Sequence, residues 1–147
     1  MRKLILCLLV VLFGCQPARY ENPIRTTSLN EVFDRSNIDQ YLITKIGDLD
    51  HEEAYALFYK GTTYIGEAKL AEGGVNAVQY SMADVYNNCL KLHCTSVITA
   101  HNHPTGYFAQ MSEVDVKSAK TLWAYLNTYK IELITNIVVT RHDTRWY

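Results

Sequence analysis

Two histidines in alternate positions, His101 and His103, are the residues of this sequence whose types and spacing most clearly suggest chemistry. Side chains alternate along an extended chain, so two residues at i and i+2 project to the same side and both imidazoles can reach one ion. Asp115 follows them and supplies a carboxylate. Histidine and carboxylate groups bind zinc, and a catalytic zinc typically has three protein ligands and one position for water. The sequence therefore predicts one zinc ion per chain, held by these three residues.

Each of these residues also has an ordinary structural explanation. The run from His101 to Gly106 contains proline and glycine, as expected of a turn at the surface. Ser112 and Asp115 have the spacing of the N-cap and N3 residues of a helix, which accounts for both without a metal. The metal site is favoured because all of these residues occur together, with an apolar segment before them and a helical pattern after them.

The apolar patterns on either side of the histidines predict the elements that position them. Residues 96–100 predict a short strand that leads into His101, and residues 112–130 predict a helix that folds back so that Asp115 faces the histidine pair. The apolar residues expected on one face of that helix are Val116, Ala119, Trp123 and Leu126.

The rest of the chain predicts further strands and helices. In chain order they are a short helix over 28–35, a short strand or edge segment over 41–46, strands over 54–59 and 64–70 joined by a turn at 60–63, an extended segment over 75–80, a helix over 81–92 and a closing strand over 131–140. Strands and helices mixed in this way favour one α/β (α+β) domain, in which helices cover both faces of a mixed sheet.

The run from His101 to Gly106, followed by Ser112-Glu113-Val114-Asp115, resembles the metal-binding motif of JAB/MPN (JAMM) domains, specifically of their RadC-type branch. There the pattern is His-Asn-His-Pro-Ser/Thr-Gly, a short loop and then Ser-x-x-Asp. The resemblance implies a single JAB/MPN domain over residues 41–147, with a layered architecture like that of cytidine deaminases. It also implies that the two histidines and the aspartate hold zinc.

The resemblance implies two further roles. An upstream glutamate acts on the water in this family, and alignment of the first long strand places Glu52 in register with it, whereas Glu53 is off by one and faces the other way. Ser112 corresponds to the hydroxyl that positions the water or stabilises the oxyanion. Glu67 and Glu72 are expected to be exposed to solvent. The implied activity is that of a zinc metallopeptidase or isopeptidase that cleaves an amide bond in a protein or peptide.

Two other functions remain as alternatives. One is a noncatalytic JAB/MPN module that binds a partner. The other is a structural zinc site formed by Cys89 and Cys94 with the two histidines. The chain also departs from the RadC-type pattern, because Tyr107-Phe108 stands in a loop that is one residue longer than expected, and Thr135-Asn136 replaces the usual Asp-His.

The first fifteen residues have the layout of a secretory signal. Arg2 and Lys3 precede an apolar run from Leu4 to Phe13, which is too short to span a bilayer as a helix, since that takes about 20 residues. The stretch from Leu12 to Cys15 resembles the lipobox of bacterial lipoproteins. It implies a signal peptide over 1–14, a lipid anchor at Cys15, a tether with the short helix over 15–40, and a membrane-attached location in the cell envelope. A simple cleaved signal or a buried strand is the alternative.

The charge balance limits the partners expected for the protein, and the cysteine content bears on its compartment. Without Arg2 and Lys3, twelve basic residues remain against fifteen acidic ones, and the basic residues are scattered, so no nucleic-acid partner is expected. Cys89 and Cys94 are the cysteines left within the domain. They are compatible with a disulfide in an oxidising compartment and equally with two separate core thiols.

Overall fold

A hairpin of two largely buried strands forms the centre of the sheet. β2 (Glu53–Lys60) and β3 (Thr63–Glu72) pair antiparallel. They turn at Gly61, whose φ of 60° lies in the left-handed region that glycine adopts at no steric cost. This hairpin confirms the prediction for residues 54–70. The computed structural model describes residues 20–21 and 34–147. The predicted signal peptide, Cys15, most of the predicted tether and the helix start at Ser28 lie outside the described residues.

The sheet is mixed and has six strands, in the order β1-β3-β2-β4-β5-β6. β1 (Tyr20–Glu21) pairs with the outer edge of β3, and β4 (Ser96–Asn102) pairs antiparallel with β2 on its other side. β5 (Glu132–Val139) runs parallel to β4, and β6 (Thr144–Trp146) closes the far edge. β4 is therefore a central strand, and it is buried along its whole length.

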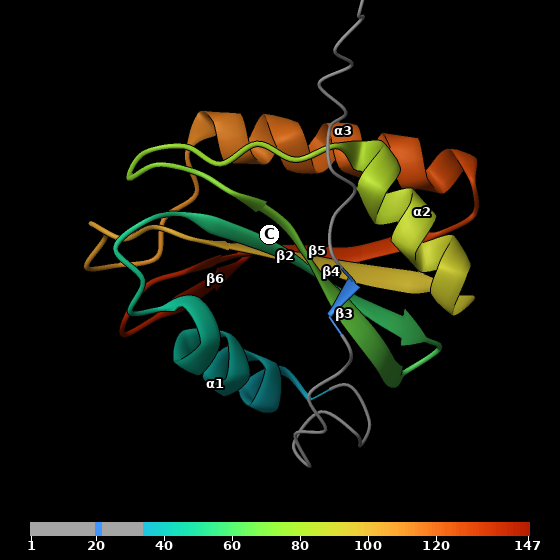
Figure 1. The fold of residues 1–147 in the computed structure, drawn as a ribbon, viewed down its shortest axis with the longest axis horizontal. Coiled ribbons are helices and arrows are strands. Elements are labelled where there is room, and N and C mark those ends of the chain that lie inside the picture. The colour runs from blue at the N-terminus through green and yellow to red at the C-terminus, as the bar shows by residue number, and fades with distance from the viewer. Residues whose placement is uncertain (1–19, 22–33) are drawn as a thin grey trace, which may run out of the picture.

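Helices cover both faces of the sheet, as predicted (Figure 1). α1 (Arg35–Ile46) packs on one face, while α2 (Met82–Leu92) and α3 (Glu113–Thr128) pack on the other. Alternate residues of β2 enter the two cores: Tyr55, Leu57 and Tyr59 face α1, and Ala54, Ala56 and Phe58 face α2 and α3. Among the described residues, no helix has the length and apolar character needed to cross a bilayer.

The strand or edge segment predicted over 41–46 is wrong, because these residues form the second half of α1. Ile38, Leu42 and Ile46 are spaced four apart and are all buried against the sheet, which is the period of a helix. Asp34 caps the helix by accepting a hydrogen bond from the backbone amide of Ser36 at 2.9 Å. The apolar positions in 41–46 alone were too few to reveal that period.

Three smaller differences concern the segments around the site. Residues 75–80 form an irregular loop instead of an extended strand. In α3, Leu122 is buried in the position expected for Trp123, whose side chain is 54% exposed. β5 does not close the domain, because β6 follows it at the edge.

Cys89 and Cys94 form a disulfide, which resolves the alternative left open by the sequence. It joins the last turn of α2 to the residues just before β4, and the chain reverses there through His93 in a left-handed conformation. The disulfide therefore fixes the start of the strand whose other end carries the histidines.

Candidate metal centre

The two histidines lie where β4 ends. His101 is within the strand, opposite Ala54 of β2 and Val138 of β5. His103 follows the strand directly, and its backbone amide donates to the carbonyl of Val139 at 2.8 Å. The end of β4 is thus held by backbone pairing on both sides, and this fixes the backbone from which both imidazoles project.

Asp115 is held in place by the start of α3. Its backbone amide donates to the Ser112 hydroxyl at 3.1 Å, and its carboxylate oxygen Oδ2 accepts from both the Ser112 amide and the Ser112 hydroxyl at 2.7 Å. This is a capping box. Ser112 and Asp115 therefore cap the helix and are also compatible with a metal site, because the cap orients the Asp115 carboxylate toward the histidines.

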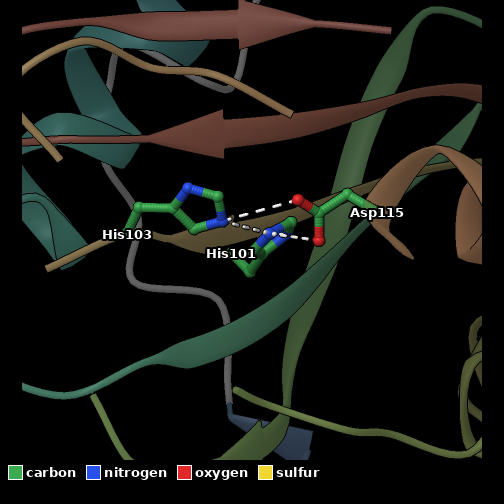
Figure 2. Close-up of side chains that lie close together, drawn as sticks. All are labelled: His101, His103 and Asp115. Carbon is green, nitrogen blue, oxygen red and sulfur yellow. Dashed lines mark hydrogen bonds and ion pairs between the residues drawn. The ribbon is translucent and has the colours of Figure 1, made fainter. Parts of the chain in front are cut away.

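Figure 2 shows that the three side chains point at a common centre. The Nε2 atoms of His101 and His103 are 3.1 Å apart, and they lie 3.1 Å and 3.5 Å from the two carboxylate oxygens of Asp115. Two ligand atoms that each lie about 2.0–2.1 Å from a tetrahedral zinc ion are about 3.3 Å apart. The observed separations lie within a few tenths of an ångström of that value, so the donor set fits zinc in both chemistry and spacing.

The electrostatics of these residues favour a positive charge between them. The hydrogen bond to Asp115 raises the pKa of His103, against the opposing effect of burial. Burial acts to raise the pKa of Asp115, but hydrogen bonds from His101, His103 and Ser112 outweigh it and hold that pKa well below its usual range. Asp115 therefore stays ionised beside the two histidines.

Glu52 lines the same cavity as the triad, immediately before β2. It is buried, and this burial raises the pKa of its carboxyl, although the nearby histidines and a hydrogen bond from the backbone of Val78 oppose the effect. The expected contrast with Glu53 is seen, because Glu53 contacts Lys69, Tyr55 and His51 instead.

The cavity has a volume of about 840 Å³ and lies between α3 and the loop over 75–80. Ser112 also lines it, so every residue predicted for the site borders one space. Their roles as ligands, base and supporting hydroxyl stay predictions. The loop over 75–80 was not predicted as part of the site; the Gly73-Gly74 pair after β3 indicates that the strand ends there but not where the loop leads.

Asn136 also lines the cavity, in the position where RadC-type chains usually carry histidine. Its side-chain oxygen accepts a hydrogen bond from the Thr99 hydroxyl at 3.1 Å. Thr135 is turned away and donates to the backbone carbonyl of Tyr147 at 2.8 Å. The departure from the family pattern therefore places a neutral amide, already hydrogen-bonded, at the cavity wall.

The expectation that Glu67 is exposed is wrong, since its side chain is fully buried beneath α1. It accepts hydrogen bonds from Tyr41 and, at 2.7 Å, from the ammonium group of Lys45. The helix that supplies both partners was predicted as a strand, so the sequence offered no partners for this carboxylate. Glu72 is exposed, as expected.

Two other groups of potential ligands are less suited to a metal. His51, Glu53 and Glu72 lie close together, but the ammonium group of Lys69 is bonded to both carboxylates and supplies the positive charge. Cys89 and Cys94 are bonded to each other, which rules out the structural zinc site that would have used both thiolates. Among the described residues, the triad at the end of β4 is therefore the best candidate.

Comparison with known families identifies the domain that carries this candidate site. Residues 32–147 match the RadC-like JAB domain. The chain belongs to this family, and the resemblance inferred from the two motifs is confirmed.

The chain is also similar to several proteins named UPF0758. It is 27% identical to one from Flavobacterium johnsoniae over 103 residues, which cover 69% of this chain and 44% of that protein. It is 31% identical to one from Vibrio cholerae over 111 residues, which cover 74% of this chain and 70% of that protein. The chain spans half or less of the length of the relatives from Flavobacterium johnsoniae, Carboxydothermus hydrogenoformans and Finegoldia magna.

Proposed function

We propose that the protein is a zinc-dependent hydrolase that cleaves an amide bond in a peptide or protein. The observation that carries this proposal is the convergence of the His101, His103 and Asp115 donor atoms at 3.1–3.5 Å, with Glu52 on the wall of the same cavity. A structural zinc site uses four protein ligands. Three candidate ligands beside a carboxylate that is not one of them are the arrangement of a catalytic site.

His101, His103 and Asp115 hold the metal in this proposal, and Ser112 holds Asp115. Zinc bound there supplies a Lewis acid that polarises a carbonyl group and lowers the pKa of water. Ser112 remains our candidate for the supporting hydroxyl. Since this hydroxyl donates to Asp115 in the structure, its first contribution is to orient that ligand, and an oxyanion contact requires the hydroxyl to rotate.

Glu52 serves as the general base and acid. Its carboxylate accepts the proton of the attacking water and delivers it to the leaving amine, a role in which a positioned carboxylate contributes about 10²–10⁴-fold. Its carboxyl is buried on the wall of the cavity that the triad also lines. The cavity volume of about 840 Å³ lies within the usual range for ligand sites, which suits a few residues of a peptide.

The test is to load the purified full chain with zinc, measure the bound metal and follow cleavage of a fluorogenic peptide library. One zinc per chain with peptide cleavage supports the hydrolase. Zinc binding without cleavage of any peptide favours the alternative, a noncatalytic binding module. A folded protein that binds no zinc removes the basis of the proposal.

We also propose that the chain is a lipoprotein of the cell envelope, anchored through Cys15. The disulfide between Cys89 and Cys94 supports export, because disulfides persist in oxidising compartments. Mass spectrometry of the membrane fraction tests the anchor. A mature chain that begins with lipidated Cys15 is expected, the Cys15→Ala variant should lack the lipid, and a chain that keeps Met1 would exclude the idea.

A further inference from the structure

Asn102, which stands between the two histidines, makes contacts that no role described so far explains. Its side chain is completely buried. The oxygen Oδ1 accepts a hydrogen bond from the backbone amide of Glu53 at 2.7 Å, and the nitrogen Nδ2 donates to the backbone carbonyl of His51 at 2.9 Å. One carboxamide thus holds the peptide groups on both sides of Glu52.

The backbone of Glu52 is held from the opposite side as well. Its amide donates to the carbonyl of Gly74 at 2.8 Å, and its carbonyl accepts from the amide of Gly73, also at 2.8 Å. The regular pairing between β2 and β4 ends at the Ala54–His101 pair, so Asn102 takes over where the strand ladder stops. Without Asn102, the backbone around Glu52 would be held by Gly73 and Gly74 after β3 but not by the end of β4.

We propose that Asn102 is a positioning residue that fixes Glu52 relative to the metal ligands. The chemistry of the side chain fits this role, because a carboxamide offers a donor and an acceptor side by side in one plane without carrying a charge. Since His101 and His103 are its immediate neighbours, the same strand end sets both the ligands and the base. The proposal rests on the proposed function for the importance of Glu52, but the clamp itself is testable without activity.

The first test measures amide hydrogen exchange by nuclear magnetic resonance in the metal-free full chain. In Asn102→Ala, the Glu53 amide loses its acceptor, and the Val78 amide loses its partner if the Glu52 carboxylate moves. Both amides should exchange at least about tenfold faster relative to the rest of the sheet. Unchanged exchange at both amides would overturn the proposal.

Matched variants separate positioning from loss of stability. Asn88→Ala removes another buried asparagine, whose Nδ2 donates to the Asp84 carbonyl within α2, far along the sequence from Glu52. It should leave the Glu53 and Val78 amides protected. Asn102→Ser is the second variant, because it keeps a neutral polar group in the buried site while its shorter side chain cannot bridge both backbone groups. The Glu53 and Val78 amides should again exchange faster, and protection of both would count against the clamp.

The second test uses the zinc-loaded protein and the peptide library. Misplacement of a reacting group by about 1 Å can cost about 100-fold, and we expect Asn102→Ala to lower kcat by that order with little change in KM. Zinc affinity should change by less than about tenfold, the smallest loss typical of removing a residue that supports a ligand. In the Glu52→Gln background, Asn102→Ala should have no further effect on kcat, because it acts through Glu52.

The two tests fail in different ways. If the wild-type protein binds zinc but cleaves nothing, while the Glu53 and Val78 amides respond to Asn102→Ala, the hydrolase is wrong and the clamp stands. If the wild-type protein cleaves peptides and Asn102→Ala is additive with Glu52→Gln, or if zinc is lost together with kcat, the clamp on Glu52 is wrong and the hydrolase stands.

Discussion

Glu52 and Glu53 are adjacent in the chain, yet they belong to two different polar regions on opposite faces of the sheet. Glu53 belongs to the face covered by α1, where the carboxylates are matched by cations. It is bonded to Lys69, and on the same face Glu67 is bonded to Lys45. Tyrosine hydroxyls complete both groups, since Tyr55 donates to Glu53 and Tyr41 donates to Glu67.

The face covered by α3 lacks such a balance. Within the described residues, the ion pairs of Asp115 go only to His101 and His103, which carry charge only when protonated. In the part of the chain that the structure describes, no lysine or arginine forms an ion pair with Glu52 either. Buried charges are stable when they are paired. On the α1 face the partners of the carboxylates are lysines, whereas on the α3 face the partners of Asp115 are the two histidines that we propose as zinc ligands.

The largest expected effect is on kcat, when the carboxylate of Glu52 or of Glu53 is replaced by an amide. Glu52→Gln should lower kcat by about 10²–10⁴-fold and keep its zinc, because the variant loses the proton acceptor and no ligand. Glu53→Gln should retain kcat within a few-fold, because its side chain faces the other way. Bound zinc and peptide cleavage are measured for both. Equal losses of activity in the two variants would abolish the distinction between the faces.

The second effect concerns stability on the α1 face. Glu67→Leu leaves the ammonium group of Lys45 without this buried partner, and breaking a buried pair costs about 3–5 kcal/mol. Urea unfolding should show this loss. Replacing both residues, as in Lys45→Met with Glu67→Leu, should recover most of it, because a buried pair can be replaced by apolar side chains. A double variant that is no more stable than Glu67→Leu alone would give this network a role beyond charge balance.

The same contrast explains what the sequence could predict. The α3-face site comes from two short motifs, each contiguous, that follow directly on a strand or open a helix, so local pattern was sufficient to bring His101, His103 and Asp115 together. Glu52 required alignment of the first long strand with the RadC-type pattern, which the resemblance supplied. The burial of Glu67 depends on α1, which covers it. The buried positions of this helix begin at Ile38, before the segment 41–46 that was predicted as a strand. Its partners are distant in sequence, and local pattern carries no information about them.

Asn102 illustrates a second limit. Its position between two histidines was visible, but its partners are backbone groups of His51 and Glu53, which every residue type carries. Only the pairing of β2 with β4 brings them within reach. For the same reason, the loop over 75–80 could not be assigned to the cavity, because the glycines that turn it away from the sheet do not show where it goes.

The third prediction concerns the disulfide before the start of β4 and tests whether the candidate metal site at the other end of this strand is independent of it. The disulfide closes a loop of five residues, and loop-closure entropy of that size corresponds to about 2 kcal/mol. The Cys89→Ala, Cys94→Ala double variant should lose about this much stability in urea unfolding and still bind one zinc. Loss of zinc at unchanged folding would connect the cysteines to the metal centre after all.

The smallest effect is the pH dependence of the metal-free protein. The pKa of His103 is raised above 6.5 by Asp115, so its contribution to stability is fully present below that pH and is lost as the pH rises through the folded pKa. The pKa of Asp115 is lowered, so its contribution is present above 3.8 and is lost only as the pH falls well below that value. The metal-free triad should therefore stabilise the fold at pH 6 and do so less at pH 8.

Urea unfolding at pH 6 and pH 8 measures this slope, and Asp115→Asn is the matched variant. His51 has a raised pKa of its own, from Asp50 and Glu53, and contributes a slope that Asp115→Asn leaves in place. The difference between the two proteins therefore belongs to the triad. Zinc should reverse it, because bound zinc requires neutral histidine and gains affinity as the pH rises. If the difference has the same sign with and without zinc, these histidines do not bind the metal, and the contrast between the two faces of the sheet is one of charge pairing alone.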